Sequence, residues 1–241
     1  MSFVIDPAPP VTIPVAGVEA VFPVNNIYCV GRNYADHAIE MGGDPNREAP
    51  FFFMKPAYAV STNGVAVSYP SHSMDVHHEL EMVVALANGG VDISVDKAMG
   101  LVYGYSIGVD MTRRDLQAEA KDKRRPWEAG KTFAQAAPLA DLLPISETGE
   151  INAAEIQLVI NGEVRQQGNV NQMIWKVSEI ISRLSEMFLL QAGDLIFTGT
   201  PAGVGAGHTP PKWLKAGDKV RVEIDCLGFT ENEIVREPGD T

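Results

Sequence analysis

The stretch His77-His-Glu-Leu-Glu-Met-Val-Val-Ala-Leu-Ala87 decides the fold of this 241-residue chain. Its second half, Met82 to Ala87, is the longest uninterrupted apolar run of the sequence. Because a membrane-spanning helix needs roughly 20 apolar residues, this run predicts a buried strand and no membrane span. Similar runs of apolar, β-branched and aromatic residues predict further strands at 27–30, 51–54, 101–109, 156–161, 194–198 and 219–224.

Helical patterns are few. The spacing of apolar residues predicts helices over 112–123 and 174–190, and shorter ones over 34–41 and 96–99. Thr112 with Asp115 three residues later is a predicted cap for the first helix, and Asn33 for the helix at 34–41. Since strands outnumber helices, we expect a β-rich α+β fold with few short helices.

One turn is predicted by its residue types alone. Asn161-Gly162 stands between two runs of strand-forming residues. Because both central positions of a type I′ turn need a positive φ, this dipeptide predicts a two-residue turn between antiparallel strands.

The composition is that of an ordinary globular protein with an acidic bias. Hydrophobic residues make up 45% of the chain, and 31 acidic against 19 basic residues give a net charge of −12. Such a charge repels phosphate backbones and anionic lipid heads alike. We therefore expect neither nucleic acid nor a membrane as a partner.

The length fits one large domain, preceded by an arm. Prolines are frequent in residues 1–24, which predicts an extended N-terminal arm, and residues 25–241 then form a single domain. The first residues lack the basic and apolar segments of a secretory signal, so the cytoplasm is the expected location. Cys29 and Cys226 are too few for a disulfide framework, and we expect both to be packed free thiols.

Three carboxylates suggest a metal site. Period-two alternation places Glu79 and Glu81 on one face of their strand, where they repel each other unless a cation or a shared proton neutralises them. A third carboxylate, Asp110, ends the strand predicted at 101–109. Three oxygen ligands at adjacent strand ends predict a site for Mg²⁺ or Mn²⁺. The alternatives are an exposed acidic strand face for the pair and a helix cap for Asp110.

His37 and Glu40 are the candidate general base and its partner. They lie three residues apart on the helix predicted at 34–41 and so share a face. A carboxylate fixes the tautomer of an imidazole and raises its basicity, which suits it to take a proton from water. An isolated histidine is more often an ordinary surface or core residue. Gly31 before this helix and Gly42-Gly43 after it predict a mobile lid.

Two further segments offer ligand-binding groups. Lys131 follows Gly130, and the string Gly193-Asp-Leu-Ile-Phe-Thr-Gly-Thr-Pro-Ala-Gly-Val-Gly205 runs from a predicted strand into a Gly-rich loop. The amides and Thr hydroxyls of such a loop bind a carboxylate or a carbonyl. The loop lacks the Gly-Lys-Ser/Thr ending of a P-loop, so a nucleotide phosphate is not expected.

Two other motifs are weaker. Gly104-Tyr-Ser-Ile-Gly108 has the Gly-x-Ser-x-Gly spacing of a serine-hydrolase elbow, but the predicted strand continues through Ser106 where an elbow needs a turn. His77-His78-Glu79 matches part of a zinc-deaminase motif, whose paired cysteines this sequence lacks.

Eight motifs occur together in a defined order. They are Gly31-Arg-Asn-Tyr-Ala-Asp-His37, His77-His-Glu-Leu-Glu81, Gly104-Tyr to Asp110, Arg114-Asp-Leu-Gln117, Gly130-Lys-Thr-Phe133, Asn161-Gly-Glu163, Arg165-Gln166 and Gly193 to Gly205. In this order and spacing the sequence resembles the fumarylacetoacetate hydrolase superfamily, and within it the single-domain acylpyruvate hydrolases of the bacterial fumarylpyruvate hydrolase type.

The resemblance implies a mixed β-roll or sandwich that forms a homodimer. It implies a divalent metal, Mg²⁺ or Mn²⁺, held by Glu79, Glu81 and Asp110. It also implies that His37 and Glu40 activate water and that Lys131 acts in catalysis. By the same matching, the residues that contact the substrate are Arg32, Asn33, Arg114, Gln117, Lys131 and Thr200.

The implied reaction is hydrolysis of the C–C bond of a 2,4-diketo acid. Fumarylpyruvate, giving fumarate and pyruvate, is the best candidate substrate, with the breakdown of aromatic compounds as the setting. Cleavage leaves an enolate, which a cation or strong donors must stabilise. Alternatives on the same scaffold are oxaloacetate decarboxylation and keto-enol tautomerisation, which need no water base. A serine hydrolase using Ser106 and a non-catalytic binding module are more distant alternatives.

Overall fold

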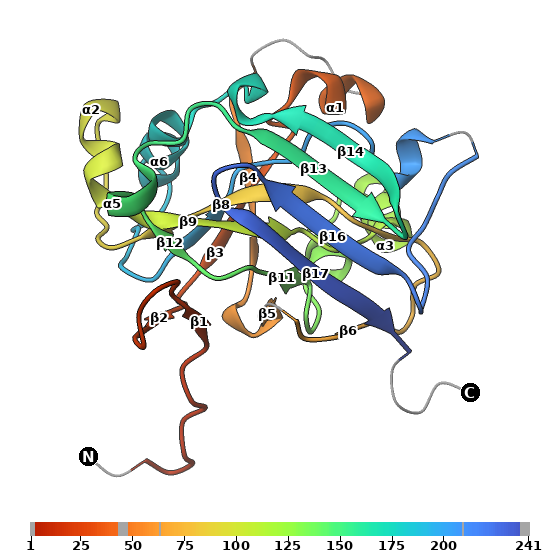
Figure 1. Cartoon of the computed structure of the whole chain (residues 1–241), viewed down its shortest axis with the longest axis horizontal. Coiled ribbons are helices and arrows are strands. Elements are labelled where there is room, and N and C mark those ends of the chain that lie inside the picture. The colour runs from red at the N-terminus through yellow and green to blue at the C-terminus, as the bar shows by residue number, and fades with distance from the viewer. Residues whose placement is uncertain (1–2, 43–47, 63, 209, 237–241) are drawn as a thin grey trace.

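The computed structural model describes residues 3–42, 48–62, 64–208 and 210–236, and these form two stacked β-sheets with short helices around them (Figure 1). Gly43 of the predicted lid lies outside the described residues. So do the first two residues of the predicted arm and residues 237–241 of the predicted domain.

The first sheet is mixed and holds the central strands. Within the described residues its order is β12 (Leu143–Pro144), β9 (Val102–Val109), β8 (Leu80–Leu86), β15 (Leu195–Phe197), β3 (Ile27–Gly31) and β4 (Phe51–Lys55). β15 and β3 are parallel, and the other neighbours are antiparallel. Every residue of β8 is buried, which accounts for its continuous apolar run.

The second sheet covers one face of the first (Figure 1). Its described strands follow the order β14 (Glu163–Asn169), β13 (Glu155–Ile160), β16 (Lys219–Ile224), β17 (Gly228–Val235) and β6 (Val67–Ser68). Buried residues alternate with more exposed ones along β13 and β16. These two strands therefore pack one face on β8 and β9 and leave the other to solvent.

Short elements complete the fold. Three small strand pairs are β1 (Thr12–Pro14) with β2 (Val21–Pro23), β7 (Val76–His77) with β10 (Thr112–Arg113), and β5 (Val60–Ser61) with β11 (Ala137–Pro138). The described α-helices are α1 (Ala35–Glu40), α2 (Val95–Ala98), α3 (Arg114–Asp122), α4 (Glu128–Lys131), α5 (Ile145–Thr148) and α6 (Val177–Ser185). The short 3₁₀ turns are η1 (Ala57–Ala59), η2 (Met99–Leu101), η3 (Val170–Gln172) and η4 (Gly205–Gly207). Among the described residues, no helix has the length and apolar character needed to cross a membrane.

The predicted β-rich α+β class is confirmed, and each predicted strand corresponds to an observed one. The turn at Asn161-Gly162 is also confirmed, since the two residues have φ of 51° and 83° and join antiparallel strands. β17 was not predicted. Its inward positions include Thr230 and Asn232, both buried, so its sequence lacks the alternation of apolar and polar residues that marks a half-buried strand.

The two long predicted helices are shorter in the structure. Thr112 and Arg113 pair with β7 as a strand, so α3 begins only at Arg114. The backbone N–H of Ile174 donates to the Asn33 carbonyl, which holds that residue outside α6. At the other end α6 stops at Ser185, and at the predicted limit the backbone N–H of Leu190 donates to the Gly90 carbonyl at 3.0 Å, outside any helix.

The two predicted caps are wrong. The Thr112 hydroxyl donates to the Asp110 carbonyl and accepts from the Lys131 ammonium. Asp115 accepts from the Ser73 hydroxyl and from the backbone N–H of Leu116. α1 begins after Tyr34 with no side-chain cap.

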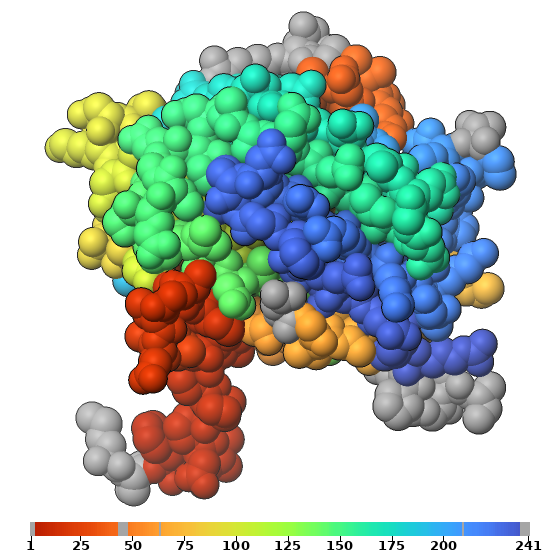
Figure 2. Space-filling model, in the orientation of Figure 1, coloured from red at the N-terminus to blue at the C-terminus, as the bar shows by residue number. Residues whose placement is uncertain are grey.

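The N-terminal segment and the cysteines differ in part from expectation. β1 and β2 bury Ile13 and Phe22 in the core, while the preceding residues 3–10 are exposed and project from the body (Figure 2). Cys29 is buried as predicted, but Cys226 is exposed because it lies in the turn between β16 and β17.

Asp194 fixes the start of β15 against β3. One oxygen of its buried carboxylate accepts from the Asn25 side-chain amide and from the backbone and side-chain N–H groups of Asn26, at 2.9 to 3.0 Å. The other oxygen accepts from the backbone N–H of Gln191 at 2.7 Å.

We expect Asp194→Ala to lower the free energy of unfolding by about 3 kcal/mol, because four N–H groups lose a buried, charged acceptor. Urea unfolding followed by circular dichroism measures the loss. Asp218 is the matched control, since its carboxylate accepts from Asn161 and from the Lys215 N–H in a more exposed place. Asp218→Ala should cost about 1 kcal/mol. Equal losses in the two variants would contradict the importance of burial at Asp194.

Candidate active site

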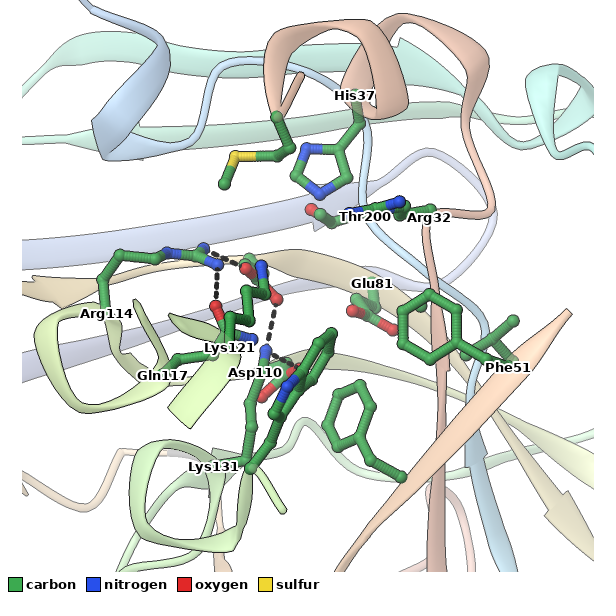
Figure 3. Close-up of a pocket in the computed structure, with 16 residues that line it drawn as sticks. Arg32, His37, Phe51, Glu81, Asp110, Arg114, Gln117, Lys121, Lys131 and Thr200 are labelled. Atoms are coloured by element: carbon green, nitrogen blue, oxygen red, sulfur yellow. Dashed lines mark hydrogen bonds and ion pairs between the residues drawn. The ribbon is translucent and has the colours of Figure 1, made fainter. Parts of the chain in front are cut away.

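A pocket lies at one edge of the first sheet, where β3 and β9 end and β8 begins (Figure 3). These three strand ends meet because β8 runs antiparallel to β9 and to β15, and β15 runs parallel to β3. The residues that line the pocket are Val30, Gly31, Arg32, His37, Met41, Phe51, Phe53, Glu79, Glu81, Asp110, Arg114, Gln117, Lys121, Trp127, Lys131 and Thr200.

The three predicted carboxylates come together in this pocket. Glu79 precedes β8, Glu81 lies in it, and Asp110 follows β9. One carboxylate oxygen from each lies within 4.8 Å of the others. Glu79 is 5% exposed and Glu81 is 2% exposed, which excludes the alternative of an exposed acidic strand face.

Two lysines neutralise part of this charge. The Lys131 ammonium lies 2.7 Å from Glu79 Oε2 and 2.6 Å from Asp110 Oδ2. Lys55 Nζ lies 2.8 Å from Asp110 Oδ1. Burial alone would lower the pKa of Lys131, but Asp110 and Glu79 raise it above its ordinary value, so Lys131 is held as an ammonium cation that donates hydrogen bonds.

Glu81 is the carboxylate without a cationic partner. It accepts the backbone N–H of Gly199 at 2.6 Å, and no ion pair to it occurs within the described ranges. Burial, and then the charges of Asp110 and Glu79, raise the pKa of Glu81 well above its ordinary value. A hard divalent cation bound by the three carboxylates would relieve this crowding, so the donor set fits Mg²⁺ or Mn²⁺.

Arg114 connects the carboxylates to the start of α3. Its guanidinium pairs with Glu79, donates to Gln117 Oε1 at 2.7 Å, and donates through Nε to His77 Nδ1 at 3.1 Å. The remaining nitrogen of His77 faces Asp75 at 2.8 Å. Burial and then the charge of Arg114 lower the pKa of His77 to about 2, so the neutral ring acts as an acceptor that orients Arg114.

The charge on Glu79 follows from the same contacts. Burial alone would raise the pKa of Glu79, but Lys131 and then Arg114 hold it well below the ordinary value. Glu79 is therefore an anion in the folded protein, ready to act as a ligand.

His37 lies over the pocket on α1 (Figure 3). Its Nδ1 is 3.2 Å from Glu40 Oε2, and Glu40 Oε1 accepts the backbone N–H of Gly203 at 2.9 Å. With Nδ1–H donated to the carboxylate, the other ring nitrogen keeps its lone pair and can accept a proton. Glu40 does not line the pocket and instead orients His37 from behind.

Two glycines of the Gly-rich loop are required by close approach. Gly199 has φ of +99°, and a Cβ there would lie 2.6 Å from that of Asn33. Gly203 has φ of +104°, and a Cβ would lie 2.1 Å from the Arg165 carbonyl oxygen. The loop can therefore present its N–H groups to Glu81 and Glu40 only with glycine at these positions.

The other predicted substrate contacts divide into two groups. Arg32, Arg114, Gln117, Lys131 and Thr200 line the pocket. The structure does not bring Asn33 there, because its side-chain amide is fully buried and bonds to the Trp175 and Thr198 backbones. Asn33 thus joins the end of β3 to the segment before α6 and to the Gly-rich loop.

The sequence reasoning missed several lining or supporting residues. Lys55 is the buried charge that directly follows the apolar run at 51–54, and that position was its signal. Phe51, Phe53 and Trp127 form an aromatic wall, with Phe51 and Trp127 packed edge to face at 5.3 Å. Lys121 also lines the pocket, and in the sequence it looks like any solvent-facing helical lysine.

The serine-elbow alternative does not fit the structure. Ser106 lies in the middle of β9, is fully buried, and donates to the Ala140 carbonyl at 2.8 Å. A nucleophile needs an exposed hydroxyl on a strand-to-helix turn. Ser106 is therefore a structural residue.

A family profile matches nearly the whole chain. Residues 26–235 match the family described as Fumarylacetoacetate (FAA) hydrolase C-terminal. The chain is 42% identical over 197 residues to a fumarylpyruvate hydrolase of a Ralstonia species, covering 82% of this chain and 97% of that protein. It is 40% identical over 200 residues to the mitochondrial oxaloacetate tautomerase of Rattus norvegicus, covering 83% of this chain and 87% of that protein.

A solved structure shares the whole fold. The fumarylpyruvate hydrolase of Pseudomonas aeruginosa, crystallised with Mn²⁺ and pyruvate, superimposes with a TM-score of 0.93 at 44% identity, covering 98% of this chain and 100% of that one. The likeness spans both sheets and the pocket between strand ends, so the predicted sheet-rich fold of this family is confirmed.

We expect Glu81→Gln to raise the thermal midpoint of the metal-free protein at pH 7 and to weaken Mn²⁺ binding by at least about 100-fold. The substitution removes like-charge crowding and an anionic ligand together. Because the folded-state pKa of Glu81 is raised, its carboxylate destabilises the metal-free fold as pH rises, so the gain should shrink on acidification.

Scanning calorimetry and titration with Mn²⁺ measure the two effects. Glu119→Gln is the matched control, since Glu119 is exposed on α3 and pairs with Lys123. It should leave Mn²⁺ binding at the wild-type level. A Glu81→Gln variant that binds Mn²⁺ as tightly as the wild type would refute the carboxylate site.

Proposed function

Because this chain belongs to the fumarylacetoacetate hydrolase family, we propose that it is a Mg²⁺- or Mn²⁺-dependent hydrolase of the C–C bond of an acylpyruvate, with fumarylpyruvate as the best candidate. The observation that carries the proposal is the His37–Glu40 pair above three buried carboxylates. Hydrolysis needs both a base for water and a site that stabilises an enolate.

The carboxylate set supports the metal. Glu79, Glu81 and Asp110 would hold it, and a bound Mg²⁺ or Mn²⁺ supplies the positive charge that stabilises an enolate oxygen. The Pseudomonas relative, which holds Mn²⁺ and pyruvate, supports both the metal and the pyruvoyl head group.

The cationic and polar lining residues suit a pyruvoyl group. Arg114 is held in place by Glu79 and Gln117, and its planar guanidinium matches the geometry of a carboxylate. Lys131 remains protonated, and its positive charge would stabilise the developing enolate oxygen. The Thr200 hydroxyl, fixed by the Gln166 amide at 2.7 Å, would contact the substrate carbonyl region.

The proton movements follow from these positions. His37, held by Glu40, takes a proton from water as the water oxygen adds to the distal carbonyl carbon. The bond between that carbon and the methylene carbon then breaks, and its electron pair enters the pyruvate enolate. A proton reaches the methylene carbon, so that pyruvate and a carboxylic acid leave.

Oxaloacetate decarboxylation or tautomerisation is the second candidate. Relatives of this chain include proteins named for oxaloacetate tautomerisation in rat and in Bacillus subtilis, the latter 39% identical over 215 residues. Both reactions pass through an enolate and therefore need the same cationic groups, but they need no activated water. The two candidates differ in what they require of His37.

We expect His37→Ala to lower acylpyruvate hydrolysis by roughly 10²- to 10⁴-fold, the usual effect of losing a general base. Its Mn²⁺ affinity should stay near the wild-type value, because His37 is not among the three ligands. Asp110→Ala should abolish every activity. Steady-state assays with fumarylpyruvate, acetylpyruvate and oxaloacetate measure these effects, and oxaloacetate decarboxylation should survive His37→Ala better than hydrolysis does.

Wild-type rates of fumarylpyruvate cleavage in His37→Ala would remove the basis of the hydrolase assignment. Robust oxaloacetate turnover with no acylpyruvate cleavage by the wild-type protein would favour the second candidate.

We also expect the helix that carries His37 to act as a lid. The hydrogen bond from Gly203 to Glu40 holds α1 down at one point. Oxalate, a small mimic of the pyruvate enolate, should lower amide hydrogen exchange across residues 34–41 of the Mn²⁺-loaded protein, and Glu40→Gln should reduce that protection. Unchanged exchange at saturating oxalate would mean that α1 is a rigid wall.

A further inference from the structure

Lys121 lies on the same face of α3 as two residues of the proposed pyruvoyl site. Arg114, Gln117 and Lys121 are spaced by three and four residues, so they form one stripe along the helix. At 1.5 Å of rise per residue, Lys121 stands about 10 Å along the axis from Arg114. All three side chains line the pocket (Figure 3). The helix thus presents a second cation to the same pocket.

The surroundings of Lys121 are positive. Its ammonium lies 4.8 Å from the centre of the Trp127 ring, and the side chain is partly buried. No carboxylate forms an ion pair with Lys121 or with Arg32 across residues 3–42, 48–62, 64–208 and 210–236. Burial, then Arg114 and then Arg32, lower the pKa of Lys121 to about 8. An anion that binds near Lys121 would therefore stabilise its protonated form.

Arg32 is held at the pocket by an unusual backbone conformation. Its φ of 57° lies in the left-handed region, which is costly for a residue other than glycine. Both neighbours of Arg32 are fixed in place. Asn33, which follows it, makes buried hydrogen bonds, and Gly31, which precedes it, lies against the Phe51 ring. The neighbours thus impose the strain, and Arg32 lines the pocket together with Thr200 (Figure 3).

We propose that Lys121, assisted by Arg32, is a subsite for a second carboxylate, located at the distal end of the acyl group. The inference rests on the proposed function and makes it more specific. The substrates are acylpyruvates that carry two negative charges, and acylpyruvates with an uncharged acyl end are poorer substrates. Arg114 and Gln117 hold the pyruvoyl carboxylate at one end of the stripe, and Lys121 holds the other carboxylate two turns away.

Two unreactive keto acids test the subsite without relying on turnover. 2-Oxoheptanedioate and 2-oxoheptanoate share the pyruvoyl head and the carbon chain, and they differ only in the terminal carboxylate. We expect calorimetry with the Mn²⁺-loaded protein to show at least about tenfold tighter binding of the diacid, the effect of a hydrogen bond to a charged group. Lys121→Met should reduce this preference by about tenfold, and Lys121→Arg should retain most of it.

Lys123→Met is the matched control. Lys123 is exposed on the same helix and pairs with Glu119. It should keep the wild-type preference for the diacid. Thermal unfolding of each variant confirms that the comparison is made between folded proteins.

The possible outcomes distinguish a failure of the proposed subsite from a failure of the proposed hydrolysis. Equal binding of the two keto acids by the wild type, or no binding of the diacid, overturns the subsite. A Lys121→Met variant that weakens both ligands equally also overturns it, because Lys121 would then only order the pocket. A diacid preference that depends on Lys121, in a protein that cleaves no diketo acid, supports the subsite and contradicts the proposed hydrolysis.

Discussion

The mutual repulsion of three buried carboxylates is the constraint on which the rest of this structure depends. Glu79, Glu81 and Asp110 meet where water is scarce, and charges so placed are tolerated only with close partners. Lys131 bridges two of them, which leaves Glu81 with a backbone N–H and no cation within the described residues. The fold therefore leaves one buried carboxylate without a cationic partner, and a divalent cation bound by all three is the natural complement to it.

The topology of the chain brings this charge together. The antiparallel pairing of β8 with β9 places residues that are about thirty positions apart side by side, and the backbone N–H of Asp110 donates to the Glu79 carbonyl at 2.8 Å. The Gly-rich loop after β15 completes the site. Gly199 and Gly203 adopt conformations in which their N–H groups donate to the carboxylates of Glu81 and Glu40.

Sequence reasoning recovered the parts of the site that follow from local periodicity. Strand alternation and a strand terminus were enough to group the three carboxylates, and helical spacing was enough to pair His37 with Glu40. The position of Asn33 away from the pocket and the ion pair of Lys55 were not foreseen, because both depend on contacts between segments far apart in the chain. An amide beside a site motif looks like a ligand contact until its partners are known. The predicted start of α6 was too early for the same reason, since Ile174 bonds to the Asn33 carbonyl and not within the helix.

Different elements of this pocket carry the groups for enolate stabilisation and for water activation, which explains how one scaffold can serve several reactions. The groups that stabilise an enolate lie at the edge of the first sheet, whereas His37 lies on a short helix whose Glu40 accepts a hydrogen bond from Gly203. Decarboxylation needs only the first set, and hydrolysis also needs a base for water. The position of α1, more than the carboxylates, would then decide between decarboxylation and hydrolysis. In the proposed subsite Lys121 would bind the far end of the ligand, so substrate selection would depend on α3, an element different from the one that carries His37. Change at α1 or along α3 can therefore alter the reaction or the substrate while the charged centre of the fold stays the same.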